Sequence, residues 1–241
     1  MAVYGHILCL GDSLTHGARD NYGRCYPMEL SDMLWYEYGQ KWICIEEGVN
    51  GEISSDILRR SISVMRKYPD ATEVVLLCGT NDSKDTVNMP PNIFRKNIEG
   101  IIRIASTYDK EVLLCTIPDL HGFGAPDYSQ DSKGRIYQFN IIIRSIVDLN
   151  KNVKELIELK GIPGEYYADG VHFNNDGYKE IARRVMKAIQ NKRHFKAKEY
   201  PAVNDVHAAT ISTETPIISV NEDDLNATDI EIHYFGDDIG E

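Results

Sequence analysis

The sequence lacks a long hydrophobic run and an N-terminal targeting segment. No stretch approaches the roughly 18 consecutive apolar residues that cross a bilayer. The first apolar run, His6–Leu10, is shorter than the apolar core of a signal peptide, which has about 7–15 residues, and no basic segment precedes it. We therefore expect a cytoplasmic protein that neither crosses nor binds membranes.

Positive charge is also scarce. The 241 residues contain 26 Lys and Arg against 37 Asp and Glu, a formal net charge of −11. Eleven of the acidic residues but only two of the basic ones follow residue 193, so most of the excess lies at the C-terminal end. An acidic chain repels phosphate backbones and anionic headgroups. Nucleic acid is therefore not expected as a partner.

The sequence has only five cysteines, and no two of them form a CxxC pair. An odd number without paired spacing argues against a disulfide framework or a zinc knuckle. The histidines likewise lack the HExxH spacing of a metallohydrolase helix. We expect no metal and no cofactor, and we expect Cys9, Cys44, Cys78 and Cys115, which fall in apolar runs, to be buried thiols.

What the sequence does contain is an alternating pattern of short apolar runs and helical segments, in a chain with 42% hydrophobic and 26% charged residues. Nearly continuous apolar runs are typical of parallel strands that are buried on both faces, so the pattern predicts an α/β three-layer fold. The expected strands are His6–Leu10, Trp42–Ile45, Glu73–Cys78, Glu111–Ile117 and Leu156–Leu159. The expected helices are Met28–Tyr38, Ser55–Lys67, Ile93–Tyr108, Ile136–Leu149 and a last one after Asn174.

The alternating pattern stops near residue 193, which predicts a main domain (residues 1–193) and an acidic C-terminal extension (residues 194–241). Two segments of the extension, Ile217–Val220 and Ile230–Phe235, fit short strands of a β arm, while its composition also fits a flexible tail. Inside the main domain, Pro118–Gly134 is rich in Gly, Pro, Asp and Ser. That composition is typical of a long functional loop.

Polar residues follow the expected strands at the edge where open α/β sheets bind their ligands. Ser13, in the string GDSL, begins a tight strand-to-helix turn, where its hydroxyl can act as a nucleophile. Gly48, in EGVNG, can present a backbone N–H, and Asn81, in GTND, can present a side-chain amide to a developing oxyanion. Taken singly, each of these residues also fits a helix cap or a turn.

After the expected fifth strand, Asp169 and His172 follow in the string DGVH. An aspartate three residues before a histidine, across a glycine, can accept the Nδ1–H of the imidazole and leave Nε2 free to take a proton from Ser13. Two further acidic residues at strand ends, Asp12 and Asp82, are expected to hold loops. One nucleophile, one oriented base and several oxyanion donors on a single edge favour a common catalytic site.

These four blocks, GDSL, EGVNG, GTND and DGVH, resemble the SGNH (GDSL-type) hydrolase family, in the order of that family and over roughly residues 5–192. The strings ILCLGDSLT and LLCGTNDSKD are similar to its arylesterase-like branch. The resemblance implies a flavodoxin-like fold with a five-stranded parallel sheet. It also implies Ser13 as nucleophile, His172 as base and Asp169 as its orienting carboxylate. The backbone amides of Ser13 and Gly48 and the side chain of Asn81 would then form the oxyanion hole.

Four further side chains lie in segments expected to border the site, namely His16, His121, Phe123 and Tyr128. Aromatic and imidazole groups suit a compact or sugar-borne acyl group better than a long chain. We therefore expect an esterase that hydrolyses short-chain carboxylic esters, such as O-acetyl groups on a small molecule or a glycan, through an acyl-enzyme.

Two other functions stay open at this point. The same serine could serve a thioesterase or an acyltransferase, which matched oxygen and sulfur esters would distinguish. A protein of another class, a non-catalytic carbohydrate-binding or assembly protein, could keep the fold without the chemistry, and a fluorophosphonate probe would then leave it unlabelled. The sequence leaves open whether the chain forms a homo-oligomer.

Overall fold

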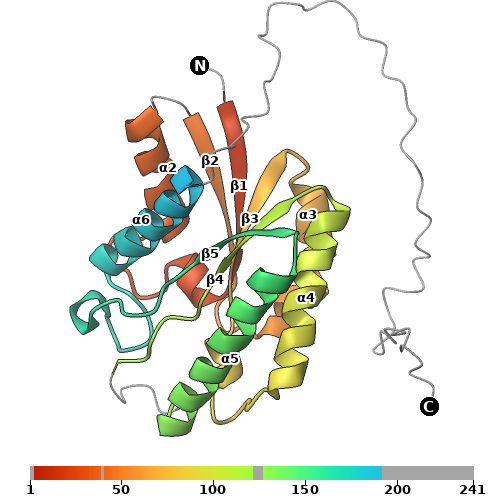
Figure 1. The fold of residues 1–241 in the computed structure, drawn as a ribbon. Coiled ribbons are helices and arrows are strands. Elements are labelled where there is room, and N and C mark those ends of the chain that lie inside the picture. Colours follow the sequence, from red (N-terminus) through yellow and green to blue (C-terminus); the bar gives the residue numbers. More distant parts are fainter. Residues whose placement is uncertain (1–2, 39–40, 122–126, 192–241) are drawn as a thin grey trace, which may run out of the picture. The chain divides into compact units, whose positions relative to one another are not determined.

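The computed structural model describes residues 3–38, 41–121 and 127–191. Within these ranges, five parallel strands form one sheet in the order β2-β1-β3-β4-β5, the order of a flavodoxin-like fold (Figure 1). The strands are β1 (Val3–Gly11), β2 (Lys41–Gly48), β3 (Ala71–Leu77), β4 (Glu111–Cys115) and β5 (Val153–Ile157). The helices are α1 (Ser13–His16), α2 (Tyr26–Tyr38), α3 (Ser54–Lys67), α4 (Pro91–Thr107), α5 (Gln130–Leu149) and α6 (Asn175–Asn191), with short 3₁₀ turns η1 (Asn81–Ser83) and η2 (Gly164–Tyr166). The expected three-layer α/β fold is confirmed.

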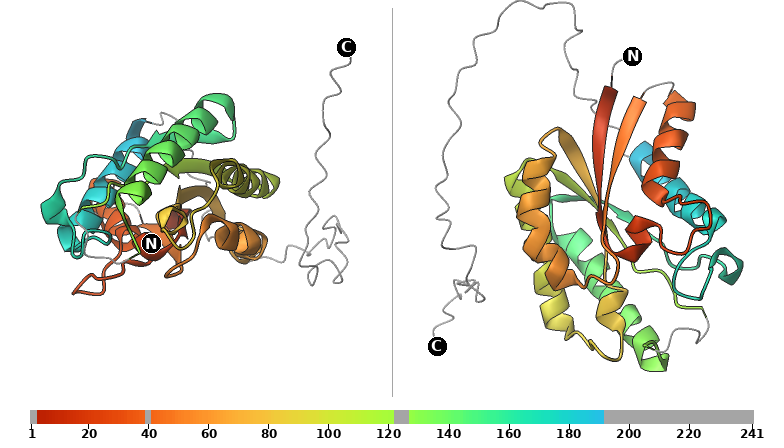
Figure 2. Two further views of the ribbon diagram at one scale, coloured as in Figure 1. Left: turned by 90° about the horizontal axis from the view of Figure 1, so that it is seen from below. Right: turned by 180° about the vertical axis from the view of Figure 1, so that it is seen from behind.

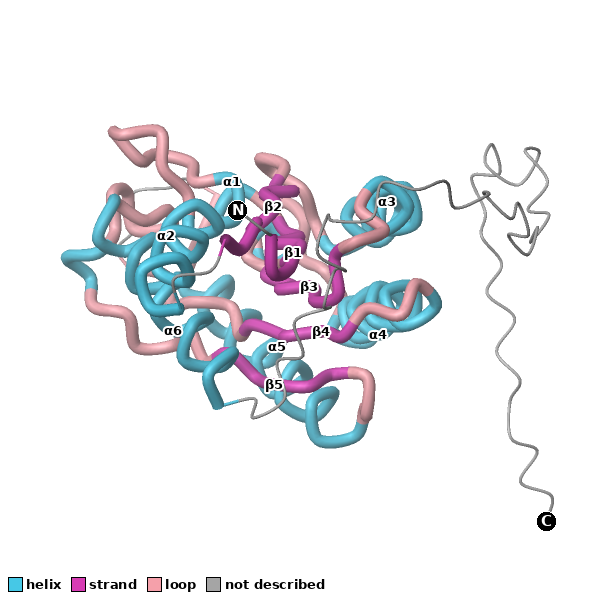
Figure 3. Tube along the Cα trace, turned by 90° about the horizontal axis from the view of Figure 1, so that it is seen from above, coloured by secondary structure: helices cyan, strands magenta, loops and turns pink. Residues whose placement is uncertain are grey.

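Helices cover both faces of the sheet. Helix α2 lies beside α6 on one face, and α3, α4 and α5 follow one another on the other (Figures 1 and 2). Figure 3, in which the molecule is seen from above and roughly along the strands, shows the strands between these two groups of helices. This double cover explains why the strands are apolar at nearly every position, since both faces of each central strand need an apolar partner.

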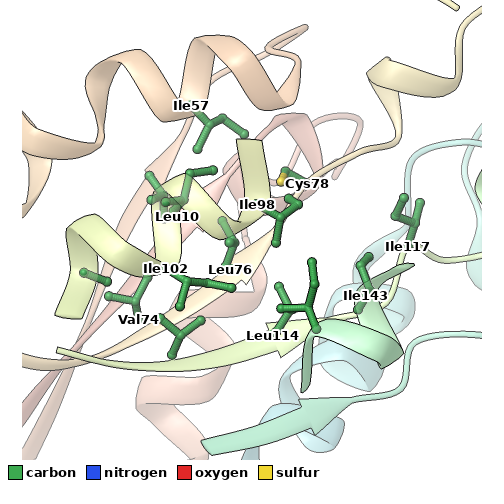
Figure 4. Close-up of a cluster of buried hydrophobic side chains, with 14 of the residues drawn as sticks. Leu10, Ile57, Val74, Leu76, Cys78, Ile98, Ile102, Leu114, Ile117 and Ile143 are labelled. Carbon is green, nitrogen blue, oxygen red and sulfur yellow. The ribbon is translucent and has the colours of Figure 1, made fainter. Parts of the chain in front are cut away.

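Alternate residues of each central strand enter different cores. In β1, Ile7 and Cys9 pack toward α2 and α6, whereas Leu8 and Leu10 pack toward α3 and α4. Figure 4 shows part of the second core, in which Leu10, Ile98 and Leu114 bring together β1, α4 and β4. Cys9, Cys78 and Cys115 are buried in these cores and the half-buried Cys44 packs against one of them, whereas Cys25 is buried outside both clusters; all five are free thiols.

Most of the expected elements differ from the structure by a few residues at their ends, and two of these differences have a clear physical reason. Helix α5 begins at Gln130, inside the segment Pro118–Gly134 that we expected to be loop throughout. Its first turn is polar and is stabilised by Ser129, whose hydroxyl accepts the N–H of Asp131, so composition alone suggested a loop. Strand β5 spans Val153–Ile157 instead of Leu156–Leu159, because at this sheet edge polar residues can face solvent.

The expected C-terminal extension (residues 194–241), with its two candidate strands, lies outside the described residues. Within residues 3–38, 41–121 and 127–191, no helix is both long and apolar enough to cross a bilayer.

The order of the strands in the sheet indicates where the site lies. Strand β1 lies between β2 and β3, so the chain leaves it first in one direction and later in the other. Such a reversal opens a crevice at the carboxyl ends of the strands.

Candidate active site

The turn after β1 fixes the position of Ser13. Asp12 caps the short helix α1, since its Oδ1 accepts the N–H of Leu14 at 2.9 Å. The strand can end this tightly because residue 11 is glycine. A Cβ there would lie 2.2 Å from the carbonyl oxygen of Leu77 and 2.3 Å from Oγ1 of Thr15. Ser13 is therefore held at the start of α1 with its side chain 7% exposed.

The segment before α6 brings His172 to this serine from 159 positions away. Ser13 Oγ lies 3.0 Å from His172 Nε2, which is hydrogen-bonding distance. On the other side of the imidazole, His172 Nδ1 lies 2.9 Å from Asp169 Oδ2. The glycine between them, Gly170, has a φ of +83°, a left-handed conformation that lets the chain turn back within three residues. The structure thus joins the three residues in one hydrogen-bonded row.

Backbone groups hold Asp169 in its ionised form. Its Oδ1 accepts the N–H of His172 at 2.7 Å and the N–H of Val171 at 3.0 Å. Partial burial of Asp169 raises its pKa, but these two N–H groups and the imidazole outweigh burial and hold the pKa of the carboxyl below its usual range. An ionised Asp169 accepts a hydrogen bond from the Nδ1–H of His172, so it selects the tautomer in which Nε2 can accept the Ser13 hydroxyl proton.

The side chain of Asn81 is fixed at both ends. It is 4% exposed. Its Nδ2 donates to the carbonyl oxygen of Glu52 at 2.9 Å, and its Oδ1 accepts the hydroxyl of Tyr128 at 3.3 Å. An amide nitrogen carries two hydrogens, so one remains for a ligand in the cavity that Asn81 lines.

The structure corrects the expected role of Gly48. Its N–H donates to Glu46 Oε1 at 2.7 Å and is therefore already paired. A Cβ at Gly48 would lie 2.3 Å from the N of His16, so this glycine allows β2 to pack against α1. Gly48 does not line the cavity that contains Ser13, whereas Gly51 does. Gly51 has a φ of +83° in a turn closed by the N–H of Glu52 and the carbonyl of Val49. The sequence prediction missed Gly51; the Asn50-Gly51 pair indicates a turn here, but not which N–H is free.

A cavity of about 980 Å³ opens at the carboxyl ends of the strands and contains the row of Ser13, His172 and Asp169. Its size is that of a small-molecule site. Three groups of residues complete its lining. They are the α1 segment His16, Gly17, Ala18 and Arg19, the turn Asn50 and Gly51, and the side chains of Asn81, Lys84, Asp127, Tyr128 and Val171.

Of the four expected substrate-binding residues, two line the cavity. His16 and Tyr128 line the cavity, where His16 Nδ1 lies 3.4 Å from Glu46 Oε1. His121 lies outside it. Its Nε2 is 3.1 Å from the carbonyl oxygen of Ile162, and its ring packs against Tyr167 with centroids 4.5 Å apart, so it supports the η2 segment. Phe123 lies outside the described residues.

A buried polar network ties two loops of the site together, as expected for Asp82. The Asp82 carboxylate accepts the backbone N–H of Ser54 at 2.9 Å and also its hydroxyl. Asn97 Nδ2 donates to the same hydroxyl at 2.9 Å. Burial raises the pKa of Asp82, although the hydrogen bonds from Ser54 oppose this. The network joins η1, which carries Asn81, to the start of α3, which follows Gly51.

The capping residue Asp12 is fully buried, and its Oδ2 has no hydrogen-bond partner among the described residues. Burial raises the pKa of Asp12 from 3.8 to about 7, against the lowering effect of the Leu14 N–H. Between these two pH values the unfolded chain has lost the proton while the folded chain keeps it. Folding stability therefore falls as pH rises from about 4 to about 7, and the loss is complete above pH 7.

Asp12→Asn should remove this pH dependence, because the amide keeps the acceptor for Leu14 and cannot ionise. We expect the free energy of unfolding of the variant, relative to wild type, to rise by about 2–4 kcal/mol between pH 4 and pH 8. Urea denaturation across this range measures the difference. Asp70→Asn, at an exposed position, is the matched control and should show no such trend. A constant difference between Asp12→Asn and wild type at all pH values would show that Asp12 is ionised throughout.

Comparison with known proteins gives a consistent result. The model of a family described as the GDSL-like lipase/acylhydrolase family matches residues 9–180. No curated protein matches significantly. The structure of a lipase/acylhydrolase from Enterococcus faecalis is 25% identical, with a TM-score of 0.65 over 78% of this chain and 96% of that chain. The aryl esterase of M. smegmatis (17% identity, TM-score 0.68) and Est24, a carbohydrate acetylesterase from Sinorhizobium meliloti (16%, 0.67), each match over 78% of this chain and 99% of theirs.

Proposed function

Since the chain belongs to the GDSL-like lipase/acylhydrolase family, as its motifs predict, we propose that it is a serine esterase that hydrolyses short-chain carboxylic esters through an acyl-enzyme. The observation that carries the proposal is the 3.0 Å separation of Ser13 Oγ and His172 Nε2, with Asp169 Oδ2 2.9 Å from Nδ1. A hydroxyl, an imidazole and a carboxylate in this row are the parts that nucleophilic acyl transfer requires.

The first half of the reaction forms the acyl-enzyme. Ser13 Oγ attacks the ester carbonyl carbon while His172 Nε2 takes the hydroxyl proton, and the ionised Asp169 stabilises the resulting imidazolium. The tetrahedral intermediate then collapses, the bond to the alcohol oxygen breaks, and His172 returns the proton to that oxygen. In the second half, water attacks the acyl-enzyme while His172 takes a proton from it. The bond between the acyl carbon and Ser13 Oγ then breaks, His172 returns the proton to Oγ, and the carboxylic acid leaves.

The negative charge of the tetrahedral oxygen needs donors that are in place before the reaction. We assign this role to the backbone N–H groups of Ser13 and Gly51 and to the side chain of Asn81. We choose Gly51 instead of Gly48 for this role because Gly51 lines the cavity and the N–H of Gly48 donates to Glu46. Asn81 Nδ2 also donates to the carbonyl of Glu52, the neighbour of Gly51, which couples the positions of these two donors.

Asn81→Ala should lower kcat by about 10²–10³, the usual loss for one oxyanion donor, with a smaller change in KM. Steady-state kinetics on 4-nitrophenyl acetate measures the effect. Asn92→Ala, at an exposed position in α4, is the control and should match wild type. A folded Asn81→Ala enzyme with the kcat of wild type would remove the side chain from the oxyanion hole.

The lining of the cavity favours a small acyl group. Among its described residues, only Ala18 and Val171 carry aliphatic side chains, whereas most of the others, Arg19 and Lys84 included, carry polar or charged groups. A long aliphatic chain would gain little from such a surface. The Sinorhizobium meliloti neighbour is named a carbohydrate acetylesterase, and a polar cavity also suits a hydroxyl-rich alcohol, so O-acetyl esters are included in the proposal.

A series of 4-nitrophenyl esters from acetyl to octanoyl tests this choice. We expect kcat/KM to be highest for acetyl or butyryl and at least about tenfold lower for octanoyl. Each rate is corrected for hydrolysis by Ser13→Ala protein under the same conditions. A rising kcat/KM toward octanoyl would contradict the proposal of a short-chain esterase and would point to an acyl-binding surface outside the described lining.

A further inference from the structure

Lys84 enters the cavity from the loop that carries Asn81. It directly follows η1, and its N–H donates to the carbonyl of Asn81 at 3.2 Å. Its own carbonyl accepts the N–H groups of Val87 at 3.1 Å and Asn88 at 2.7 Å. The backbone of Lys84 is therefore fixed relative to Asn81, and its half-buried side chain lines the same cavity as Ser13.

The ammonium group of Lys84 has a ring beside it but no carboxylate. Its Nζ lies 5.8 Å from the centroid of the Tyr128 ring, at the outer limit of a cation–π contact. In the described part of the chain, no carboxylate oxygen lies within 4.0 Å of this nitrogen. By contrast, Lys67 pairs with Glu47 and Lys154 pairs with Glu111. Lys84 thus presents three N–H donors to the cavity.

The other charged groups that line the cavity do not neutralise the ammonium group of Lys84. Asp169 is engaged by His172 and has Arg19 Nε 3.4 Å from its Oδ2. Arg19 itself is 69% exposed, so the ends of its guanidinium remain accessible. Asp127 lines the cavity but is exposed. The positive charge of Lys84 lowers the pKa of the buried Asp12 electrostatically.

We propose that Lys84 binds an anionic group, a carboxylate, on the ester substrate, so that the enzyme prefers esters with a negative charge a few bonds from the scissile carbonyl. The inference rests on the proposed esterase function and narrows its substrate class. Residues 1–193, which carry the cavity, contain 24 basic and 26 acidic residues, so they have no excess of positive charge that would attract anions in general. A cation that lines the cavity of the nucleophile, with no carboxylate partner among the described residues, therefore has the chemistry of a specificity group, with Arg19 at the cavity as a second cation.

Two pairs of esters test the proposal and distinguish the two places where the carboxylate can lie. For the alcohol side, 3-acetoxybenzoate is compared with its methyl ester. For the acyl side, 4-nitrophenyl hydrogen adipate is compared with its methyl ester. The readout is the ratio of kcat/KM for the anionic ester to kcat/KM for its neutral partner, after subtraction of the uncatalysed rates.

We expect a ratio above 1 in wild type for at least one pair, and a fall of about tenfold in Lys84→Met. Lys84→Arg should retain most of the preference, and Asp127→Asn should increase it. Added salt should lower the wild-type ratio, because salt screens exposed charges. Lys160→Met, which removes an exposed lysine away from the cavity, is the control and should keep the wild-type ratio.

The ratio of kcat/KM for the anionic and the neutral ester distinguishes a Lys84 that binds the substrate carboxylate from a Lys84 that only stabilises the fold. If Lys84 served only to offset the charge of Asp12, its replacement would change both members of a pair equally and leave the ratio constant, which would overturn the proposal. A wild-type ratio at or below 1 for both pairs would also overturn the proposal for Lys84, but it would leave the esterase function intact. A wild type that hydrolyses none of the four esters would contradict the proposed function itself, and this inference with it.

Discussion

Replacing Ser13 by alanine is expected to lower kcat/KM for 4-nitrophenyl acetate by about 10⁴–10⁶, to a level near the background rate. The hydroxyl is the nucleophile in our account, and His172 Nε2 lies 3.0 Å from it. The fold should persist, because alanine suits the start of α1 and, among the described residues, the side chain of Ser13 hydrogen-bonds only to His172. Steady-state kinetics and a circular dichroism spectrum of the same preparation measure both quantities.

Ser63→Ala is the matched control, because Ser63 is an exposed serine on α3 that bonds only to a backbone carbonyl of its own helix. It should hydrolyse the ester at the wild-type rate. A folded Ser13→Ala protein that keeps more than about 1% of wild-type kcat/KM would mean that another group attacks the ester, since loss of a nucleophile costs far more than this. The row of Ser13, His172 and Asp169 would then have no catalytic role.

Asp169→Asn is expected to lower kcat by about 10⁴ with little loss of structure. Asparagine keeps an oxygen that can accept the N–H groups of Val171 and His172, which now bind Asp169 Oδ1 at 3.0 and 2.7 Å. It removes the charge that stabilises the imidazolium and selects the Nδ1–H tautomer. The geometry of the turn should therefore survive while the base becomes ineffective.

Asp176→Asn tests the specificity of this effect, since Asp176 is an exposed aspartate on α6 whose Oδ1 lies 3.5 Å from Lys179 Nζ. Its kcat should equal that of wild type. The double variant Ser13→Ala, Asp169→Asn should be no slower than Ser13→Ala alone, because residues that act as one unit are not additive. Additive losses, or a kcat for Asp169→Asn within tenfold of wild type, would contradict the role of Asp169 as orienting carboxylate.

The sequence predicted the fold well wherever burial controls the pattern. The apolar runs of β1, β3 and β4 were found because both of their faces are covered, so nearly every residue is apolar. The prediction was less accurate at β5, an edge strand, and at the first turn of α5. At both places polar residues take part in regular structure, so composition resembles that of a loop.

For the site, Ser13 was predicted from its position at the end of β1, and Asp169 and His172 from their Asp-x-x-His spacing, both of which are local signals. The pair does not lie at a strand end as predicted, because β5 already ends at Ile157 and the pair belongs to the segment before α6. The choice between Gly48 and Gly51 could not be predicted from local signals, because it depends on which N–H is already paired. Only the structure shows that Glu46 accepts the N–H of Gly48. Lys84 was missed for a related reason, since a lysine after η1 looks like a surface residue until Tyr128 and Ser13 are placed on the same cavity.

The most direct test of the account is to identify the residue that a fluorophosphonate probe modifies. The probe phosphonylates a serine hydroxyl that a neighbouring base activates. After incubation, intact-mass measurement and peptide mapping should show a single adduct, on the peptide that contains Ser13, and none in the Ser13→Ala protein. An unmodified wild type, or an adduct on any other residue, would contradict the claim that Ser13 is an activated nucleophile.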